Sequence, residues 1–149
     1  MKTFHHVLCG ALALLGMSCG REDPVSGSFG SVRDLAGGTW TLQYFARERL
    51  RGPLDGTEIT LEFRMDDVPV LVGRAGCNQY GARFTAVENR IGVEPIMSTE
   101  MLCTNPNGTM EQEAWYLSQL AQARGFSVRD DRLALLDETG APLLVFVRR

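Results

Sequence analysis

Short stretches in which apolar and polar residues alternate recur along most of the chain. The clearest is 58–64, where Ile59, Leu61 and Phe63 alternate with polar residues. A period of two is typical of β-strands with one face on a core and the other in water. The same alternation, or a nearly all-apolar run in the last case, predicts further strands at 39–44, 68–72, 84–87, 91–93, 126–128, 133–135 and 143–147.

In one segment the period becomes helical, and the apolar residues that share a face there are Met110, Ala114, Leu117, Leu120 and Ala121. Thr109 with Gln112 three residues later predicts a capping box at the start. Arg124 and Gly125 supply a stop signal at the end. The sequence therefore predicts one helix over about 110–124, and we expect Met110 and Trp115 to lie in the core or at its edge.

Turn residues separate the predicted strands, and some of them are acidic. A hairpin is expected to turn near Glu88-Asn89. The pairs Asp66-Asp67 and Asp130-Asp131 suit acid–base chemistry or calcium binding as well as turns. Neighbouring residues of a strand point to opposite faces, so paired carboxylates there cannot share a site. The turn interpretation is therefore favoured for both pairs.

The first 31 residues follow a different pattern. A weakly positive start and the apolar stretch Val7–Leu15 are followed by Gly16-Met17-Ser18-Cys19, which predicts a signal peptide at 1–18. The segment also resembles a bacterial lipoprotein signal, in which Cys19 carries the lipid. Ordinary cleavage after Ser18 is the alternative, and a buried N-terminal helix of a cytosolic protein is the least favoured. Residues 19–31 are polar and rich in Gly and Ser, which predicts a flexible tether before a domain at 32–149.

The charged residues exclude several classes of function. The net charge of the 149 residues is −3 and there is no basic block, which argues against a nucleic-acid partner. The only lysine is Lys2 and the only histidines are His5 and His6, all in the expected leader. Without the leader, Ser-His-Asp and Cys-His catalysis, lysine Schiff bases and histidine metal sites are all excluded. We therefore expect no catalytic residue, cofactor or metal, although carboxylate chemistry is not excluded by composition.

Four cysteines give a further indication of export. Cys9 would be lost with the leader and Cys19 would carry the lipid, which leaves Cys77 and Cys103. In an oxidising compartment this pair is expected to form a disulfide worth about 3.5 kcal/mol. Two unpaired thiols are the alternative. Two cysteines without histidine are only half of a zinc site.

Three motifs resemble those of the META/HslJ-like domain. They are LAGGTWTL at 35–42, GRAGCNQY at 73–80 and MSTEMLC at 97–103. One departure is Leu102, where alanine is common in the family. Together with the alternating pattern, the resemblance predicts a mainly β (α+β) fold, an antiparallel, partly open barrel-like sheet with the helix 110–124 packed against it.

The second motif has a structural and a functional interpretation. Gly73 and Gly76 allow backbone geometry that other residues resist, and Asn78 can hold a tight bend by bonding to the backbone. Tyr80 brings a large apolar face with a polar tip to the core. The alternative is a ligand-binding groove lined by Asn78, Tyr80 and Thr99.

The resemblance implies a modest set of functions. Such domains occur in secreted proteins and envelope lipoproteins, some are associated with heat-shock response or antibiotic tolerance, and no catalytic activity is shared. We therefore expect a non-enzymatic lipoprotein that acts in envelope maintenance or stress tolerance by binding. We expect it to be held by Cys19 at the outer membrane, facing the periplasm, because Gly20 lacks an acidic retention signal. A secreted soluble form is the alternative location. A periplasmic inhibitor or pilot-like module that binds one protein partner or lipid is the second hypothesis, and a carboxylate hydrolase is the third.

Overall fold

The structure of the protein, a computed structural model, describes residues 30–47 and 51–149. The expected leader, Cys19 and most of the expected tether lie outside the described residues. The elements are α1 (Val32–Leu35), β1 (Trp40–Phe45), β2 (Glu58–Arg64), β3 (Val70–Gly76), β4 (Gln79–Val87), β5 (Arg90–Val93), β6 (Met97–Ser98), α2 (Thr109–Ala121), β7 (Gly125–Arg129), β8 (Arg132–Leu136) and β9 (Pro142–Arg148).

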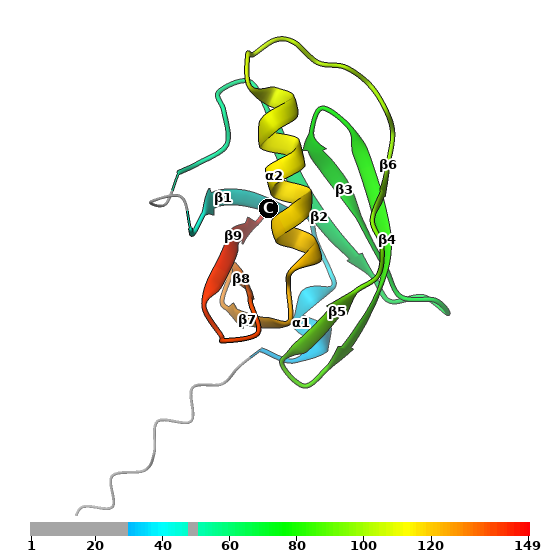
Figure 1. Cartoon of the computed structure of the whole chain (residues 1–149). Helices are drawn as coiled ribbons and strands as arrows, with labels where there is room; N and C mark the ends of the chain where they lie inside the picture. Colours follow the sequence, from blue (N-terminus) through cyan, green and yellow to red (C-terminus); the bar gives the residue numbers. More distant parts are fainter. Residues whose placement is uncertain (1–29, 48–50) are drawn as a thin grey trace, which may run out of the picture.

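The strands form an antiparallel barrel with one main helix (Figure 1). Their order is β3-β2-β1-β9-β8-β7-β5-β4, and the pairing of β3 with β4 closes the ring, while β6 adds to the outside of β4. The expected mainly β, barrel-like fold is therefore confirmed. The ring is thinnest where β5 meets β7, because Arg90 with Gly125 is the one residue pair that joins these strands in the described chain.

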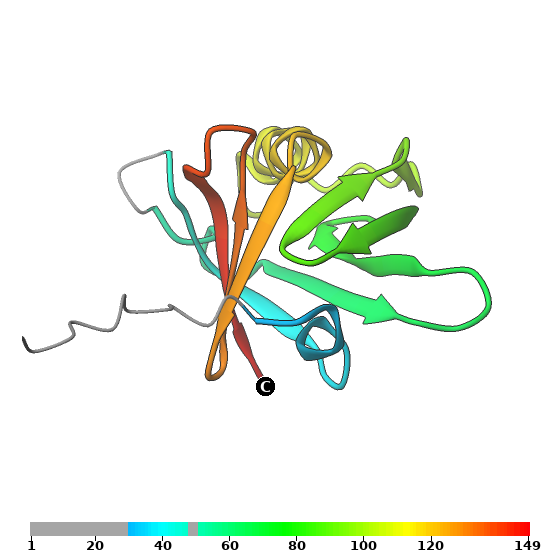
Figure 2. The same ribbon diagram turned by 90° about the horizontal axis from the view of Figure 1, so that it is seen from below.

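Apolar side chains from the strands and from both helices fill the barrel. The two helices lie on opposite sides of it in the view of Figure 2, and Leu35 of α1 and Leu120 of α2 are completely buried. The nearly all-apolar run 143–147 forms β9, which pairs with both β1 and β8 as a well-covered strand should. The largest fully buried side chains are Trp40, Tyr116, Phe126, Phe146, Leu35, Ile59, Leu61, Leu71, Leu120, Leu133, Leu135 and Leu143.

Strand β1 departs from simple alternation. Trp40 and Leu42 point into the core as predicted, but Phe45 is buried and Tyr44 is only half-buried. The register of β1 against β9 shifts between Leu42 and Tyr44. A bulge of this kind inserts one residue and turns the following side chains to the other face.

The valines of β3 do not form the inward face that their spacing predicts. Val68 precedes the strand and is exposed, and Val70 and Val72 are half-buried on its outer face. Leu71 lies between them and is buried. The reason is register: Leu71 pairs with the buried Phe63 of β2, and neighbours across a sheet share a face.

Helix α2 begins differently from the prediction. Its N-cap is Gly108 in the left-handed conformation (φ 90°), with no side-chain cap. The hydroxyl of Thr109 donates to Pro106 O (2.6 Å) instead, and the side chain of Gln112 contacts the segment after β1. The expected capping box is therefore wrong. At the other end the guanidinium of Arg124 donates to Ala121 O (2.9 Å), so a basic side chain does satisfy a terminal carbonyl.

The buried face of α2 also differs from the apolar face that we expected. Ala114 and Ala121 are exposed, and Leu117 is only half-buried. Trp115, expected in the core or at its edge, is 37% exposed. Leu120 is buried as predicted, and the other buried residues of the helix are Thr109, Glu113, Tyr116 and Gln119.

The expected turns are confirmed. Glu88, between β4 and β5, has a φ of 55°, and Asp130, between β7 and β8, has a φ of 52°. Asp66-Asp67 lies in the connection of β2 and β3. Both acidic pairs therefore occupy turns, as favoured.

The two residues before α1 contact the barrel and the helix. Gly30 is buried with its Cα against Val128 of β7, where an added Cβ would lie 2.5 Å from that side chain. Ser31 caps α1 by accepting from the N–H of Arg33 (3.2 Å). Gly30 therefore contacts β7, whereas Ser31 is exposed and serves as the cap of α1. Among the described residues, no helix has the length and apolar character needed to cross a membrane.

Candidate functional site

The candidate site is built around the bend that joins β3 to β4. Gly76 has a φ of 111°, a conformation that glycine adopts without strain. The next two residues, Cys77 and Asn78, form the bend, and Ala75 N–H donates to Asn78 O (2.8 Å) to close it. The first turns of α2 lie against this bend, since a Cβ on Gly76 would be 3.2 Å from the side-chain nitrogen of Gln112. The motif glycine therefore gives both the turn and the close approach of the helix.

A buried carboxylate from α2 holds the bend. Glu113 Oε2 accepts from the backbone N–H groups of Asn78 (2.7 Å) and Cys77 (3.2 Å). Its Oε1 accepts from Asn78 Nδ2 (2.7 Å). Glu113 is only 5% exposed, and a buried carboxylate needs partners of this kind. Helical periodicity does not identify Glu113, because that pattern considers only the apolar residues of the helix.

Asn78 connects the bend to the third motif. Its Oδ1 accepts from the hydroxyl of Thr99 (2.7 Å) and the N–H of Met101 (2.7 Å). Its Nδ2 donates to Met101 O (3.0 Å) as well as to Glu113. An asparagine side chain has two donor hydrogens and two acceptor lone pairs, so all four are used inside the protein. Asn78 is 1% exposed, and its role in the structure is to join three separate segments.

A disulfide lies beside this network. Cys77 and Cys103 are joined, with their Cα atoms 5.9 Å apart and a separation of 26 positions in sequence. The expected pairing is thus present in the structure. It ties the segment that follows β6 to the bend, next to the hydrogen bonds that Asn78 makes to Met101.

Two buried tyrosines extend the network toward β2. Tyr80 and Tyr116 have their hydroxyls 2.6 Å apart, and the Tyr80 hydroxyl donates to Thr60 O (2.8 Å). Since that hydroxyl has one proton, the Tyr116 hydroxyl is the donor between the two rings. Burial raises the pKa of Tyr80 well above its usual value, with the neighbouring phenol adding to the effect, and burial raises the pKa of Tyr116 as well. A Cβ on Gly73 would lie 2.0 Å from Thr60 O, which explains the glycine at that position.

The first motif forms a separate contact at the other end of the barrel. Trp40 is fully buried, and its indole N–H donates to Leu35 O (2.8 Å). The guanidinium of Arg148 lies 4.3 Å from the centre of the indole ring. Close packing of Arg148 against Gly38 leaves little room for a side chain there. The motif residues are therefore explained by contacts within the fold.

The expected ligand groove of Asn78, Tyr80 and Thr99 stays a prediction. The structure brings the three residues together, but the polar groups of Asn78 and Tyr80 bond within the chain and both side chains are buried. Thr99 is exposed and is the part of the set that a ligand can reach. In the part of the chain that the structure describes, no three His, Cys, Asp or Glu side chains gather where they could hold a metal ion.

Comparisons with known proteins agree with this fold. A model of the META domain family matches residues 33–149. An NMR structure of a protein from Burkholderia xenovorans has a TM-score of 0.64 and 23% sequence identity, over 99% of this chain and 99% of that chain. A second NMR structure of a protein has a TM-score of 0.57 and 15% identity, over 77% of this chain and 92% of that chain. No curated protein matches the chain. At these identities the two structures establish a shared fold only.

Proposed function

The chain belongs to the META domain family, and we propose that it is a non-catalytic lipoprotein of the cell envelope, anchored at Cys19. In this proposal it acts in envelope maintenance, or in tolerance of stress or antibiotics, by binding other components. The anchor places it at the outer membrane, facing the periplasm. The alternative is a soluble secreted protein.

The arrangement of the cysteines carries the proposal. Cys77 and Cys103 are bridged, and stable disulfides are typical of exported proteins. Cys19 stands apart from this pair, directly after an apolar stretch and small residues. A signal-like segment that ends at a cysteine, followed by a polar linker and a disulfide-containing domain, supports export with a lipid at Cys19.

The non-catalytic part of the proposal rests on the use of the polar residues. From residue 20 onward the sequence contains no histidine and no lysine, the side chains most often used as bases or amine nucleophiles. The buried carboxylate of Glu113 accepts three hydrogen bonds within the fold. Groups committed to holding a bend are poorly placed to move protons to or from a substrate.

Metabolic labelling with a fatty-acid probe in a bacterial host tests the anchor. The wild-type chain should become labelled and fractionate with membranes, and Cys19→Ser should abolish the label. Cys9→Ser is the matched control, because this cysteine lies within the expected leader and its loss should leave the label intact. Labelling that survives Cys19→Ser, or unlabelled wild-type protein in the soluble fraction, would contradict the anchor.

A second candidate is an inhibitor or pilot-like module that binds one protein partner or lipid. It is favoured by the exposed apolar side chains of Met97, Met101 and Leu102, which are 79%, 52% and 80% exposed. They lie along β6 and the residues after it, and β6 ends the strand order, so its outer edge has no partner strand in the described chain. A photo-crosslinker at Leu102 should capture one defined partner in intact envelopes, whereas one at the exposed Val87 should not. Equal capture from both positions would argue against a specific surface.

A further inference from the structure

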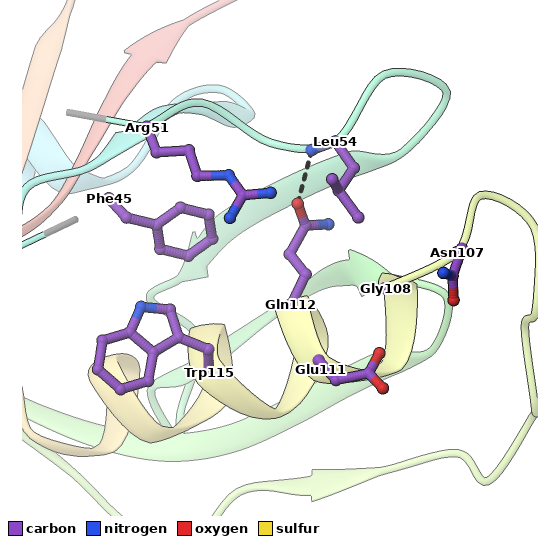
Figure 3. A pocket seen from close by; sticks show the side chains of 8 residues that line it. All are labelled: Phe45, Arg51, Leu54, Asn107, Gly108, Glu111, Gln112 and Trp115. Atoms are coloured by element: carbon purple, nitrogen blue, oxygen red, sulfur yellow. Dashed lines mark hydrogen bonds between the residues drawn. The ribbon is translucent and has the colours of Figure 1, made fainter. Parts of the chain in front are cut away.

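A pocket of about 220 Å³ lies between the first turns of α2 and the segment that follows β1 (Figure 3). Its apolar walls are the ring of Phe45, the side chain of Leu54 and the indole of Trp115. Phe45 is 3% exposed, whereas Trp115 is 37% exposed at the mouth. A half-exposed tryptophan over an apolar hollow is a common feature of ligand sites.

The walls are held in place by hydrogen bonds. Phe45 N–H donates to Arg51 O (2.8 Å), which fixes the backbone of Arg51 opposite β1. Gln112 Oε1 accepts from Leu54 N–H (2.6 Å), and its Nε2 donates to Thr57 Oγ1 (3.0 Å). Gln112 therefore attaches the segment after β1 to the helix and holds this wall of the pocket in position.

Two hydrogen-bond donors at this pocket have no protein acceptor among residues 30–47 and 51–149. The guanidinium of Arg51 makes no hydrogen bond or ion pair to any described residue, and neither does the indole N–H of Trp115. Figure 3 shows the guanidinium beside the Phe45 ring and the nitrogen edge of the indole turned toward that ring. The other tryptophan is different, since the indole N–H of Trp40 donates to Leu35 O. The pocket thus combines a fixed apolar wall with a cation and a neutral donor that make no hydrogen bond to the part of the chain that the structure describes.

We propose that this pocket binds an organic carboxylate with an aromatic or aliphatic body. The body would lie against Phe45, Leu54 and Trp115, and the carboxylate would accept from Arg51 and from the indole N–H of Trp115. A guanidinium presents donors in a planar fork that matches a carboxylate, and such charge-assisted bonds are the stronger ones. Glu111 also lines the pocket and repels an anion, so its removal should tighten binding. The inference rests on the proposed binding role but not on the anchor.

Titration with 3-phenylpropionate tests the site by NMR. The Cys19→Ser chain, expressed with its own leader and labelled with ¹⁵N, is used so that the outcome does not depend on lipid attachment. Trp40 and Trp115 are the only tryptophans, and Trp115→Phe assigns their two indole signals. The Trp115 signal should shift saturably while the Trp40 signal stays in place. 3-Phenylpropionamide, which has the same body without the charge, should bind roughly tenfold more weakly.

Two charge variants identify the chemistry of the ligand. Arg51→Gln should weaken binding of 3-phenylpropionate roughly tenfold, and Glu111→Gln should strengthen it about twofold. Unchanged melting temperatures in both variants show that the fold is intact. Equal binding of the acid and the amide, tighter binding of 3-phenylpropylammonium, or unsaturable shifts would overturn the proposal. The fatty-acid labelling result bears on the anchor alone, so the two proposals can fail separately.

Discussion

The bend around Asn78 and the wall made by β8 and β9 are both buried, but different forces hold them. On the wall, Leu135, Leu144 and Phe146 are completely buried and interact by packing alone. At the bend, Asn78 and Glu113 are almost as deeply buried, and hydrogen bonds between their polar atoms determine the geometry. The wall therefore needs side chains of suitable volume, whereas the bend needs particular atoms in particular places.

The difference has consequences for how each region tolerates change. A packed apolar position accepts another apolar side chain of similar volume at a cost below about 1.5 kcal/mol. A buried hydrogen-bonded group cannot be replaced in this way, because its partners are then left unsatisfied at about 1–3 kcal/mol each. Substitutions that preserve side-chain shape should therefore reveal a larger difference in stability loss between the bend and the wall than truncations do.

The largest effect is expected for Glu113→Ala, which leaves the backbone N–H groups of Cys77 and Asn78, and one of the two amide hydrogens of Asn78, without an acceptor. We expect it to lower the free energy of unfolding by about 3–5 kcal/mol. Leu135→Ala on the wall should cost a similar amount, about 2–5 kcal/mol, through the cavity that it creates. Denaturant unfolding of the purified variants measures both.

Shape-preserving variants are the controls for this comparison. Glu113→Gln keeps the volume but places an amide group where Asn78 Nδ2 donates, and it should still cost about 2 kcal/mol. Leu135→Met should cost less than about 1.5 kcal/mol. If Glu113→Gln were as mild as Leu135→Met, the bend would not depend on the acceptor atoms of the carboxylate.

Reduction of the Cys77–Cys103 disulfide is the next largest change. The bridge closes a loop of 26 positions, and by chain entropy its loss should cost about 3.5 kcal/mol. Melting temperatures with and without reductant measure the effect, and the double variant Cys77→Ser/Cys103→Ser should show no further change on reduction. Hydrogen exchange should locate the loss, with faster exchange near Met101 and little change in β8 and β9. Uniform acceleration across both regions would mean that the bend and the wall unfold as one unit.

The contrast also explains which features could be predicted from sequence. The strands of the wall were found because alternation directly reflects which side chains are buried. The run 143–147 was identified as well covered for the same reason. The fold class and the disulfide pair were also accessible, the latter because only Cys77 and Cys103 remain in the domain.

The bend was only partly accessible. The motif glycines and Asn78 indicated a tight turn, but Glu113 lies 35 positions from Asn78 and looks like an ordinary solvent-exposed helix residue. Its burial depends on a partner that helical periodicity does not consider. Strand register also depends on residues that are distant in sequence. Leu71, rather than its neighbouring valines, points inward because it pairs with Phe63 on another strand. Three buried donors make a glutamate favourable at position 113, but this can be recognised only when Asn78 is known to lie beside α2.

Alkaline pH should weaken the polar region specifically. Tyr80 and Tyr116 have pKa values raised above their usual value of 10 by burial. Above about pH 10 the unfolded chain loses phenolic protons that the folded chain keeps, so stability falls as pH rises, by about 1.4 kcal/mol per pH unit for each proton. Below pH 10 the two tyrosines should not change the stability of the protein with pH. Urea unfolding between pH 8 and 11 measures the slope, which should be shallower for Tyr80→Phe although that variant is less stable at pH 7. If Tyr80→Phe had the same slope as the wild type, the loss of stability could not be assigned to these tyrosines.

The smallest effect is expected at Leu102. This residue lies next to the disulfide but belongs neither to the packed wall nor to the hydrogen-bonded bend. Its side chain is 80% exposed, and exposed positions without special contacts usually change stability by less than about 0.5 kcal/mol. Leu102→Ala, which restores the residue common in the family, should therefore leave the melting temperature within about 2 °C of wild type. Leu120→Ala, at a fully buried position on α2, is the contrasting control and should cost about 2–5 kcal/mol. A large loss at Leu102 would mean that the segment after β6 packs as a third region of the core. If stability is unchanged but crosslinking to an envelope partner is lost, the exposed leucine contacts that partner.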